Sequence, residues 1–453
     1  MKEFLIVGGI LLAIVGLMFA NKKFLETVKN IFKIEELRKR IVYTVLLILV
    51  YRLGCYVVIP GIDPEALKPL ESQTEGGLVG LLNVFSGGAF ANASLFALGV
   101  MPYITASIII QLLGMMVPAV QRMMKEGESG RRKMNNWTRL LTIGVLAIQG
   151  PAYLANLHVQ APNAFIFGPS VWFTIYAILL LIAGTMFVMW LGEKITDKGI
   201  GNGVSLIIMI GIVARLPHAL MGELSAQLAT GSIIMVIVEL ILLFVIFMAT
   251  IAVVQAVRKI PVQYAKRIIG NKQYGGVRQY IPLKMNAANV MPIIFAQALM
   301  FIPMLFASVA PKFAAAFADM TGVWYNLTLA VLVIVFTYFY TAIIINPQQM
   351  AEDMKRNGGF IPGVKPGKAT VSYVDGILTR ITLPGSIFLA LVAIMPAIAM
   401  VAGVSQSFAY FFGGTSLLIM VGVVLDTLQQ IESHLLNRHY DGLMKTGRIQ
   451  GRH

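Results

Sequence analysis

Ionisable side chains inside apolar runs are the residues of this sequence that could do chemistry within a membrane. Glu239 is the only carboxylate deep in such a run, Asp426 lies nearer the end of another, and none of the five histidines is central to a run. Ion-coupled transport typically uses several buried ionisable groups around a midplane site. A single deep carboxylate is too few for such a site. We therefore interpret Glu239 as a protonated or paired group that packs between helices or faces a partner.

Other reactive groups are scarce. The sequence has no HExxH metal motif, no Walker phosphate loop and no GxSxG motif in a strand-to-helix setting. Arg52 and Arg215 lie in apolar runs, where we expect Arg52 to snorkel or pair inside the bundle and Arg215 to reach the interface. The single cysteine, Cys55, excludes an internal disulfide. We expect no catalytic residues, no metal and no cofactor.

The elements that hold these residues are membrane helices. The 453 residues are 57% hydrophobic and 13% charged, whereas a soluble domain has about 25% charged residues. Apolar runs of about 20 residues fit helices and are too long for the strands of a barrel. The predicted spans are an extra one at 4–20 and ten core spans at 41–59, 92–118, 136–157, 171–191, 203–217, 231–257, 287–310, 324–346, 376–400 and 411–431.

The basic residues predict the topology. Most of the 36 lysines and arginines lie in six segments, at 21–40, 119–139, 192–203, 258–288, 347–380 and 431–453. Because basic residues stay on the cytoplasmic side, both ends of the ten-helix core are expected in the cytoplasm. The positions of these basic residues thus account for the net charge of +15, and binding to nucleic acid is not needed to explain it. Two sets of five helices would form oppositely oriented halves.

The first apolar segment, 4–20, has three interpretations. A cleaved signal peptide would leave the lysine-rich stretch 21–40 outside, against the charge rule. A wrongly assigned upstream start is the second alternative. We expect an additional helix with its N-terminus outside. The expected regions are this segment at 1–27, a first half at 28–217, a sixth span at 218–257, a basic loop at 258–288, four spans at 289–431 with a cytoplasmic loop at 347–375, and a tail at 432–453.

The external segment Gly77–Phe85 is too short to span a bilayer and too apolar for water. Such segments are typical of re-entrant pieces buried in protein, and an interfacial loop is the alternative. Gly87 and Gly88 follow it and let the backbone bend.

Six motifs carry a family resemblance. The run FSGGAFANASLFALGVMPYITASIIIQLL (85–113) resembles the plug and second helix of the SecY/Sec61-alpha family. The others, in the family's order, are KEGESGRRK (125–133), WLGEKITDKGIGNGVS (190–205), PVQYAKR (261–267), YTAIIINP (340–347) and FGGTSLLI (412–419). The resemblance covers about residues 28–445 and implies an all-α, polytopic clamshell of two inverted five-helix halves, with 4–20 as an extra helix.

The resemblance also implies site residues. A collar of aliphatic side chains would line the pore, formed by Val100, Ile104, Val204, Ile208, Ile294 and Ile419. A plug would lie at 77–90, with Leu78, Leu81, Leu82, Val84, Phe85, Gly87 and Gly88. The polar cluster of a lateral gate would be Gln111, Thr138 and Asn286. Without the resemblance, each of these residues would be read as ordinary helix packing.

The cytoplasmic loops 258–288 and 347–380 are the expected docking face, with Lys266, Arg267, Lys272, Arg278 and Lys365. The resemblance implies docking of the ribosome and the ATPase SecA, companion subunits SecE and SecG, and contacts with SecDF and YidC. Lys365 departs from the family's usual arginine, which loses the bidentate fork. Loop tip 271–272 has one basic residue where the family often has two.

The expected function is a channel that passes unfolded polypeptide across a bacterial cytoplasmic membrane and releases membrane helices into lipid. Signal sequences would open it, and a partner would supply the energy. A small-solute secondary transporter is the first alternative, which solute uptake in vesicles lacking preprotein would support. An intramembrane enzyme would need a paired catalytic constellation that the sequence lacks. A specialised translocase with a dedicated motor is the third alternative.

Overall fold

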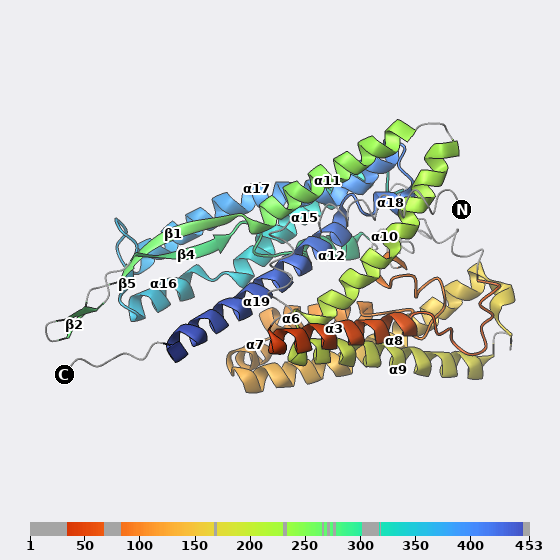
Figure 1. The fold of residues 1–453 in the computed structure, drawn as a ribbon, viewed down its shortest axis with the longest axis horizontal. Coiled ribbons are helices and arrows are strands. Elements are labelled where there is room, and N and C mark those ends of the chain that lie inside the picture. The colour runs from red at the N-terminus through yellow and green to blue at the C-terminus, as the bar shows by residue number, and fades with distance from the viewer. Residues whose placement is uncertain are drawn as a thin grey trace. The chain divides into compact units, whose positions relative to one another are not determined.

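The computed structural model describes residues 34–67, 83–166, 170–229, 233–264, 267–269, 272–274, 278–300, 317 and 319–446. These residues are mostly helical (Figure 1). Three sets of predictions fall outside the described residues, namely those for the span 4–20, for the plug residues Leu78, Leu81 and Leu82, and for Lys266. The chain divides into two compact units, Met1–Ser225 with Val423–His453 (unit 1) and Ala226–Gly422 (unit 2).

Unit 1 is built on helices that pack along one another. Its elements are α3 (Glu35–Gly54), α6 (Met101–Met116), α7 (Pro118–Lys125), α8 (Glu128–Gln160), η1 (Pro162–Ala164), α9 (Val171–Lys198) and most of α10 (Gly203–Ala229). Helix α8 packs against α6 and α9, and α3 packs against α9. A core that includes Ile59, Phe90, Leu157 and Leu181 joins the segments around residues 59–67 and 90–98 to α8 and α9.

Unit 2 combines helices with a small sheet. Its elements are α11 (Ile233–Gln255), β1 (Val257–Tyr264), β2 (Arg267–Ile269), β3 (Lys272–Tyr274), β4 (Arg278–Lys284), α12 (Met291–Leu299), α15 (Val323–Ile344), α16 (Pro347–Arg356), β5 (Gly359–Phe360), α17 (Lys368–Val401), α18 (Gln406–Ala409) and the start of α19 (Gly414–Thr446). Helix α15 packs between α12 and α17. The core of these helices includes Ile293, Val333, Leu389 and Leu417.

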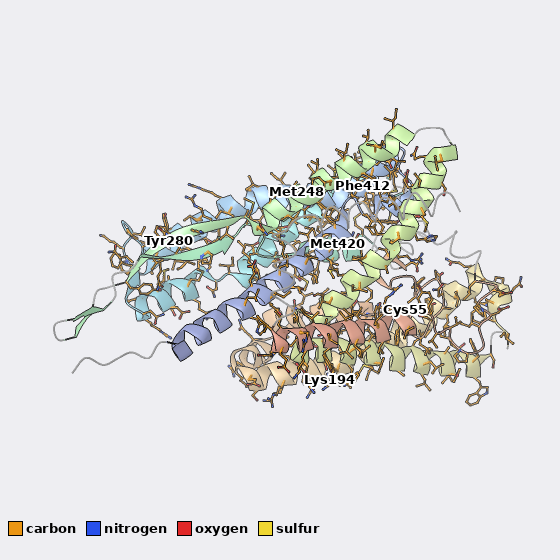
Figure 2. All side chains as sticks on the ribbon, viewed as in Figure 1. Cys55, Lys194, Met248, Tyr280, Phe412 and Met420 are labelled. Carbon is orange, nitrogen blue, oxygen red and sulfur yellow. The ribbon has the colours of Figure 1, made fainter. Side chains whose placement is uncertain are left out.

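Long apolar helices match the expected membrane class. Seven helices in the described part of the chain are long and apolar enough to cross a membrane, at Glu128–Gln160, Val171–Lys198, Gly203–Leu228, Ile234–Gln255, Val323–Arg356, Lys368–Val401 and Gly414–Leu435. Their outer side chains are apolar as well. Met248 stands out from α11 in Figure 2 and is 52% exposed. Such side chains suit lipid, which needs no polar surface.

Each of the ten predicted core spans overlaps a helix, but several ends differ. The span predicted at 92–118 is helical only from Met101, because residues 92–100 form turns and Gly99 has a φ of +52°. The end predicted at 217 is wrong, since α10 continues through Pro217 to Ala229. A proline is tolerated there because neighbouring groups in a bundle can satisfy the carbonyl that it frees. Arg215 therefore lies inside a 27-residue helix and not near its end.

The basic loop 258–288 contains a sheet that the sequence analysis did not predict. Strand β1 pairs antiparallel with β4, with Ile260 opposite Ile281, and β1 also pairs with β5 through Gln263 and Phe360. Ile260 and Val262 point into a core with residues of α16 and α17, while their neighbours on β1 are exposed. This alternation is what makes a strand with one buried face. The two expected docking loops thus contribute to one folded module.

Candidate functional site

Four of the expected collar residues lie at the starts of two helices of unit 1. Val100 is the N-cap of α6 and Ile104 lies in its first turn, while Val204 lies in the first turn of α10 and Ile208 one turn later. Val100 and Ile208 are buried, and Ile104 and Val204 are half-buried.

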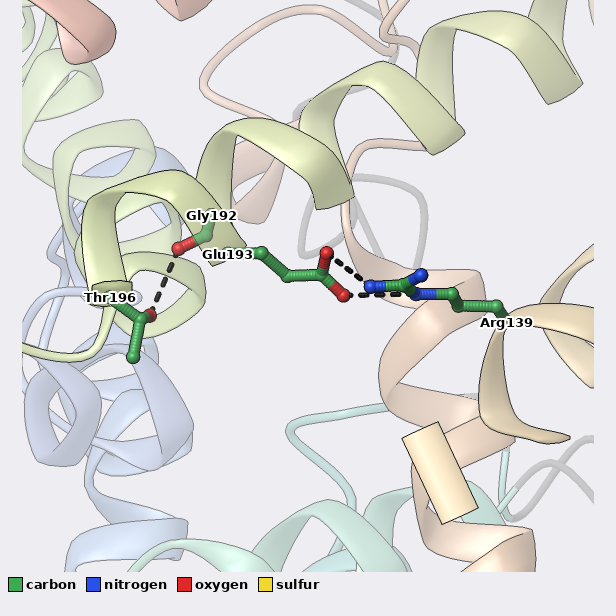
Figure 3. A network of polar contacts seen from close by, with 4 residues as sticks. All are labelled: Arg139, Gly192, Glu193 and Thr196. Atoms are coloured by element: carbon green, nitrogen blue, oxygen red, sulfur yellow. Dashed lines mark hydrogen bonds and ion pairs between the residues drawn. The ribbon is translucent and has the colours of Figure 1, made fainter. Parts of the chain in front are cut away.

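The start of α10 is held against α9 by a close backbone approach. A Cβ on Gly203 would collide with the carbonyl of Gly192, and a Cβ on Gly192 would lie 2.9 Å from Val204 Cγ2. Thr196 Oγ1 donates to Gly192 O at 2.9 Å (Figure 3) and accepts from Gly203 N at 2.9 Å. These contacts leave Val204 little freedom.

The turn before α10 has further anchors within unit 1. Ile200 N donates to Thr44 Oγ1 at 3.1 Å, and Gly201 N donates to Gln430 Oε1 at 2.8 Å. Side chains of α3 and α19 therefore satisfy two backbone donors of this buried turn, which would otherwise be costly to leave unpaired.

One ion pair joins α8 to α9. Arg139 Nη2 and Nε donate to the two carboxylate oxygens of Glu193 at 2.6 and 3.1 Å (Figure 3). The side chains are 42% and 30% exposed. A bidentate pair of this kind sets the angle of both side chains as well as their separation. It adjoins Thr138, an expected gate residue, and the sequence analysis missed it because 54 residues separate the partners.

Breaking this pair has a predicted cost. We expect Arg139→Met to lower the stability of the folded channel by about 1–2 kcal/mol, because it leaves Glu193 half-buried without its partner. Thermal unfolding in detergent measures this. A double-mutant cycle with Arg139→Glu, Glu193→Arg and the two changes together checks the pair. The double variant should be more stable than the sum of the two single losses predicts, because the exchanged charges can pair again. An additive cycle would show that the pair contributes nothing.

The described part of the expected plug, residues 83–90, is buried against α10. A Cβ on Gly211 would lie 2.8 Å from Phe85 O and 3.3 Å from Gly87 N, so this glycine lets the two backbones touch. Gly211 follows Ile208 by one turn of α10. Ser86 also lies beside Gly99, which precedes Val100. Residues 85–87 thus lie beside the collar positions of both helices in unit 1.

Hydrogen bonds hold residues 83–90 in this place. Asn83 Oδ1 accepts from Ala91 N at 3.1 Å, and its carbonyl accepts from Gly88 N at 2.9 Å. The Tyr153 hydroxyl of α8 donates to Phe90 O at 2.9 Å. Val84 and Phe85 are half-buried and buried respectively. These hydrogen bonds fix the described part of the expected plug, so it is not a free loop.

The three expected gate residues differ in their surroundings. Gln111 Nε2 donates to Ser107 Oγ at 3.4 Å, and Thr138 Oγ1 donates back to Met134 O at 2.9 Å within its own helix. Asn286 is buried, and its Oδ1 has no hydrogen-bond partner among the described residues. A buried amide oxygen without a protein partner is unusual. Gln111 and Thr138 belong to unit 1 and Asn286 to unit 2.

The remaining collar and docking residues lie in unit 2. Ile294 on α12 and Ile419 on α19 are half-buried, next to Ile293 and Leu418, which are buried. The docking candidates lie in this module or next to it in the sequence: Arg267 on β2 and Lys272 on β3, which pair in a separate two-stranded sheet, Arg278 on β4, and Lys365 in the exposed turn before α17.

The carboxylates need one correction. Glu239 on α11 is buried, and Gln227 Nε2 donates to its Oε1 at 3.4 Å, which fits the expected paired group. Glu223 is fully buried as well. The predicted span 203–217 ends before Glu223, so the sequence did not mark this residue as a deep carboxylate.

Comparison with known proteins decides the family. A family model described as SecY matches residues 94–428 of this chain. The protein translocase subunit SecY of Streptomyces scabiei is 43% identical over 436 residues, which cover 91% of this chain and 98% of that protein. The chain belongs to the SecY family. The SecY subunit of Aquifex aeolicus is 41% identical, covering 93% of this chain and 99% of that protein.

Solved structures show the SecY fold. One described as a protein-conducting channel has a TM-score of 0.59 at 18% identity and covers 91% of this chain and 95% of that one. A Sec61 in the canine ribosome-channel complex has a TM-score of 0.56 at 16% identity with the same coverage. As a SecY protein, the chain is the protein-conducting channel subunit of the Sec translocase, a multi-pass membrane transporter and not an enzyme. The predicted family, fold class and function are confirmed.

Proposed function

We propose that polypeptide crosses this SecY channel through a collar of Val100, Ile104, Val204, Ile208, Ile294 and Ile419, with residues 77–90 as the plug. One observation carries the proposal most strongly. The backbone of Phe85–Gly87 rests on Gly211, one turn from Ile208, and also adjoins Gly99. A segment that touches α10 and the turn just before α6 is placed to seal the pore at rest.

Aliphatic side chains suit a collar for any passing sequence. They have no hydrogen bonds to satisfy, so they can part around polar or apolar side chains alike. An empty apolar constriction loses its water and blocks ions. The half-buried state of Ile104, Val204, Ile294 and Ile419 supports a lining role, because these residues are not fully packed within their own unit.

The lateral gate is proposed at Gln111, Thr138 and Asn286. Polar contacts between membrane helices contribute modestly and can be replaced by water or a signal helix. The buried Asn286 Oδ1, which lacks a partner among the described residues, supports this role. A signal sequence that wedges this seam would widen the collar and let a membrane helix leave into lipid.

We propose the regions and topology of the sequence analysis for the whole chain, in a bacterial cytoplasmic membrane with both ends of the core in the cytoplasm. The relatives are bacterial SecY proteins, and basic residues crowd one side. The regions are 1–27, 28–217, 218–257, 258–288, 289–431 and 432–453, and the module of β1, β4, β5 and α16 would project into the cytoplasm.

The proposed partners dock on that module. Similar structures are described as ribosome-bound, namely the canine Sec61 complex and the yeast Ssh1 complex on the 80S ribosome. Arg267, Lys272, Arg278 and Lys365 would meet ribosomal phosphates or an acidic surface of SecA. SecE and SecG would complete the complex, with SecDF and YidC as further contacts.

A disulfide across the gate tests the proposed function. In a Cys55→Ser background, Gln111→Cys and Asn286→Cys should crosslink on oxidation and stop export of a secretory protein in vesicles. Serine at 55 retains a donor for Ser86 O, which lies 4.0 Å from the Cys55 sulfur. Reduction should restore export, and export by each single-cysteine variant should be the same under oxidising and reducing conditions. Full export after verified crosslinking would contradict the gate.

A further inference from the structure

Two arginines of unit 1 meet the backbone at neighbouring glycines. Arg52 Nη1 of α3 donates to Gly87 O at 3.1 Å, and its Nη2 lies 3.4 Å from the Tyr56 hydroxyl. A Cβ on Gly88 would lie 3.0 Å from both Nε and Nη2 of Arg215 of α10, so that guanidinium packs directly on this backbone. Both arginines are half-buried. The sequence analysis expected Arg52 to snorkel or pair inside the bundle and Arg215 to reach the interface.

The turn at Gly87 and Gly88 needs this enclosure and also needs glycine. Their φ angles are +64° and +93°, which side chains rarely adopt. A Cβ on Gly87 would lie 2.6 Å from Arg52 Nη1 and 2.9 Å from Gly211 Cα. The turn is therefore enclosed by a side chain of α3 and by both a side chain and the backbone of α10. For the turn to separate from Gly211, the side chain of Arg52 or of Arg215 has to move.

A second side chain of α3, next to Arg52 in the sequence, also contacts this turn. The Tyr51 hydroxyl donates to Ser86 O at 3.4 Å, and Tyr51 is fully buried. Unlike Tyr51, Arg52 is a charged donor. Hydrogen bonds from ionised groups are stronger than neutral ones, and a charge in a membrane helix needs such partners. Arg52 therefore contributes more to holding the turn than its neighbour does.

We propose that Arg52 is a positioning residue of the channel seal, which holds the Gly87–Gly88 turn against Gly211 while Arg215 packs on the next glycine. The inference rests on the proposed function, because the turn continues directly from residues 85–86 beside the collar. Loss of the Arg52 donor lets the turn leave Gly211. Phe85 and Ser86 then move away from Ile208 and Gly99, and the resting channel opens although the collar itself is unchanged.

Ion conductance of the purified channel in lipid vesicles, with no polypeptide present, tests the inference. Arg52→Met should raise the resting conductance at least about fivefold, since the seal is displaced. Lys39→Met is the control on the same helix, because Lys39 is 73% exposed and forms an ion pair with Glu35 of α3, away from the collar and the plug. It should conduct as the unmodified protein does. Arg52→Lys should leak less than Arg52→Met, since one ammonium can reach Gly87 O without the two-armed fork.

Two further variants make every outcome decisive. Gly88→Ala leaves both arginines in place but strains the turn and presses on Arg215, so it should leak as well, and it replaces Arg52→Met if that protein does not fold. The double variant Ile104→Gly and Ile208→Gly reports on the collar. Leakage from the collar variant, while a folded Arg52→Met stays tight (or Gly88→Ala, where Arg52→Met does not fold), overturns this inference alone. Tight channels in all of them overturn the proposed function as well.

Discussion

Replacing Ile104 and Ile208 with glycine is expected to make the resting channel leak ions, with conductance at least about tenfold above that of the unmodified protein. The reason is the loss of the apolar constriction that excludes water when no chain is present. Ile208 is buried and Ile104 half-buried at the starts of α10 and α6. Planar-bilayer recording of the purified channel measures the effect directly.

The matched control places the same substitution on the outside of unit 1. Ile148 on α8 and Ile175 on α9 are 77% and 47% exposed. Glycine at both positions costs helix stability in the same way, about 1 kcal/mol each, but removes nothing from the collar. Equal leakage from the control pair would attribute the effect to general loosening of the helices and would count against the assigned collar.

Placing a charge inside the module of β1, β4, β5 and α16 is expected to unfold it locally and abolish the proposed docking. Val262 is 1% exposed and packs on a core that includes Leu283, Met354 and Val374. Val262→Asp buries a carboxylate without a partner there, which costs about 3 kcal/mol or more. A module of this size has little stability to spare. Protease cutting within 258–288 should accelerate, and binding to ribosomes in a sedimentation assay should fall to background.

Tyr280→Asp is the control for this variant. Tyr280 lies on β4 opposite Pro261 of β1 and is 57% exposed (Figure 2). The new charge is the same and lies on the same sheet, but it faces water. We expect normal protease resistance and a small loss of docking at most. If both variants lost ribosome binding equally while both resisted protease, the loss would be due to the added charge and not to unfolding of the module.

The sequence predicted the membrane helices well because each needs an apolar run long enough for the bilayer. It predicted their ends less well. The fifth core span was predicted to end at residue 217, yet α10 continues for 12 more residues to Ala229 and buries Glu223. The strand β1 was also missed, although Ile260 and Val262 alternate with exposed neighbours. Its signal spans few residues and lies within a strongly basic segment.

Contacts between distant residues could not be predicted from spacing. Arg139 and Glu193 are 54 residues apart, and Arg52 and Gly87 are 35 apart. Each residue alone is compatible with snorkelling or with many partners. The collar residues are a different case. By type alone, Ile104 cannot be distinguished from Ile110, which is buried in the packing of α6, and only the family resemblance singled it out.

Crosslinking of a chain caught in transit tests the central claim most directly. A photoreactive amino acid would replace Ile104 on α6, Ile294 on α12 or, as an outward-facing control, Ile148 on α8, and a secretory protein would be stalled partway across the membrane. We predict that the stalled chain crosslinks at the first two positions and not at the third. Crosslinks at Ile148 alone, or at none of these positions while export proceeds, would contradict passage through the interior of this subunit.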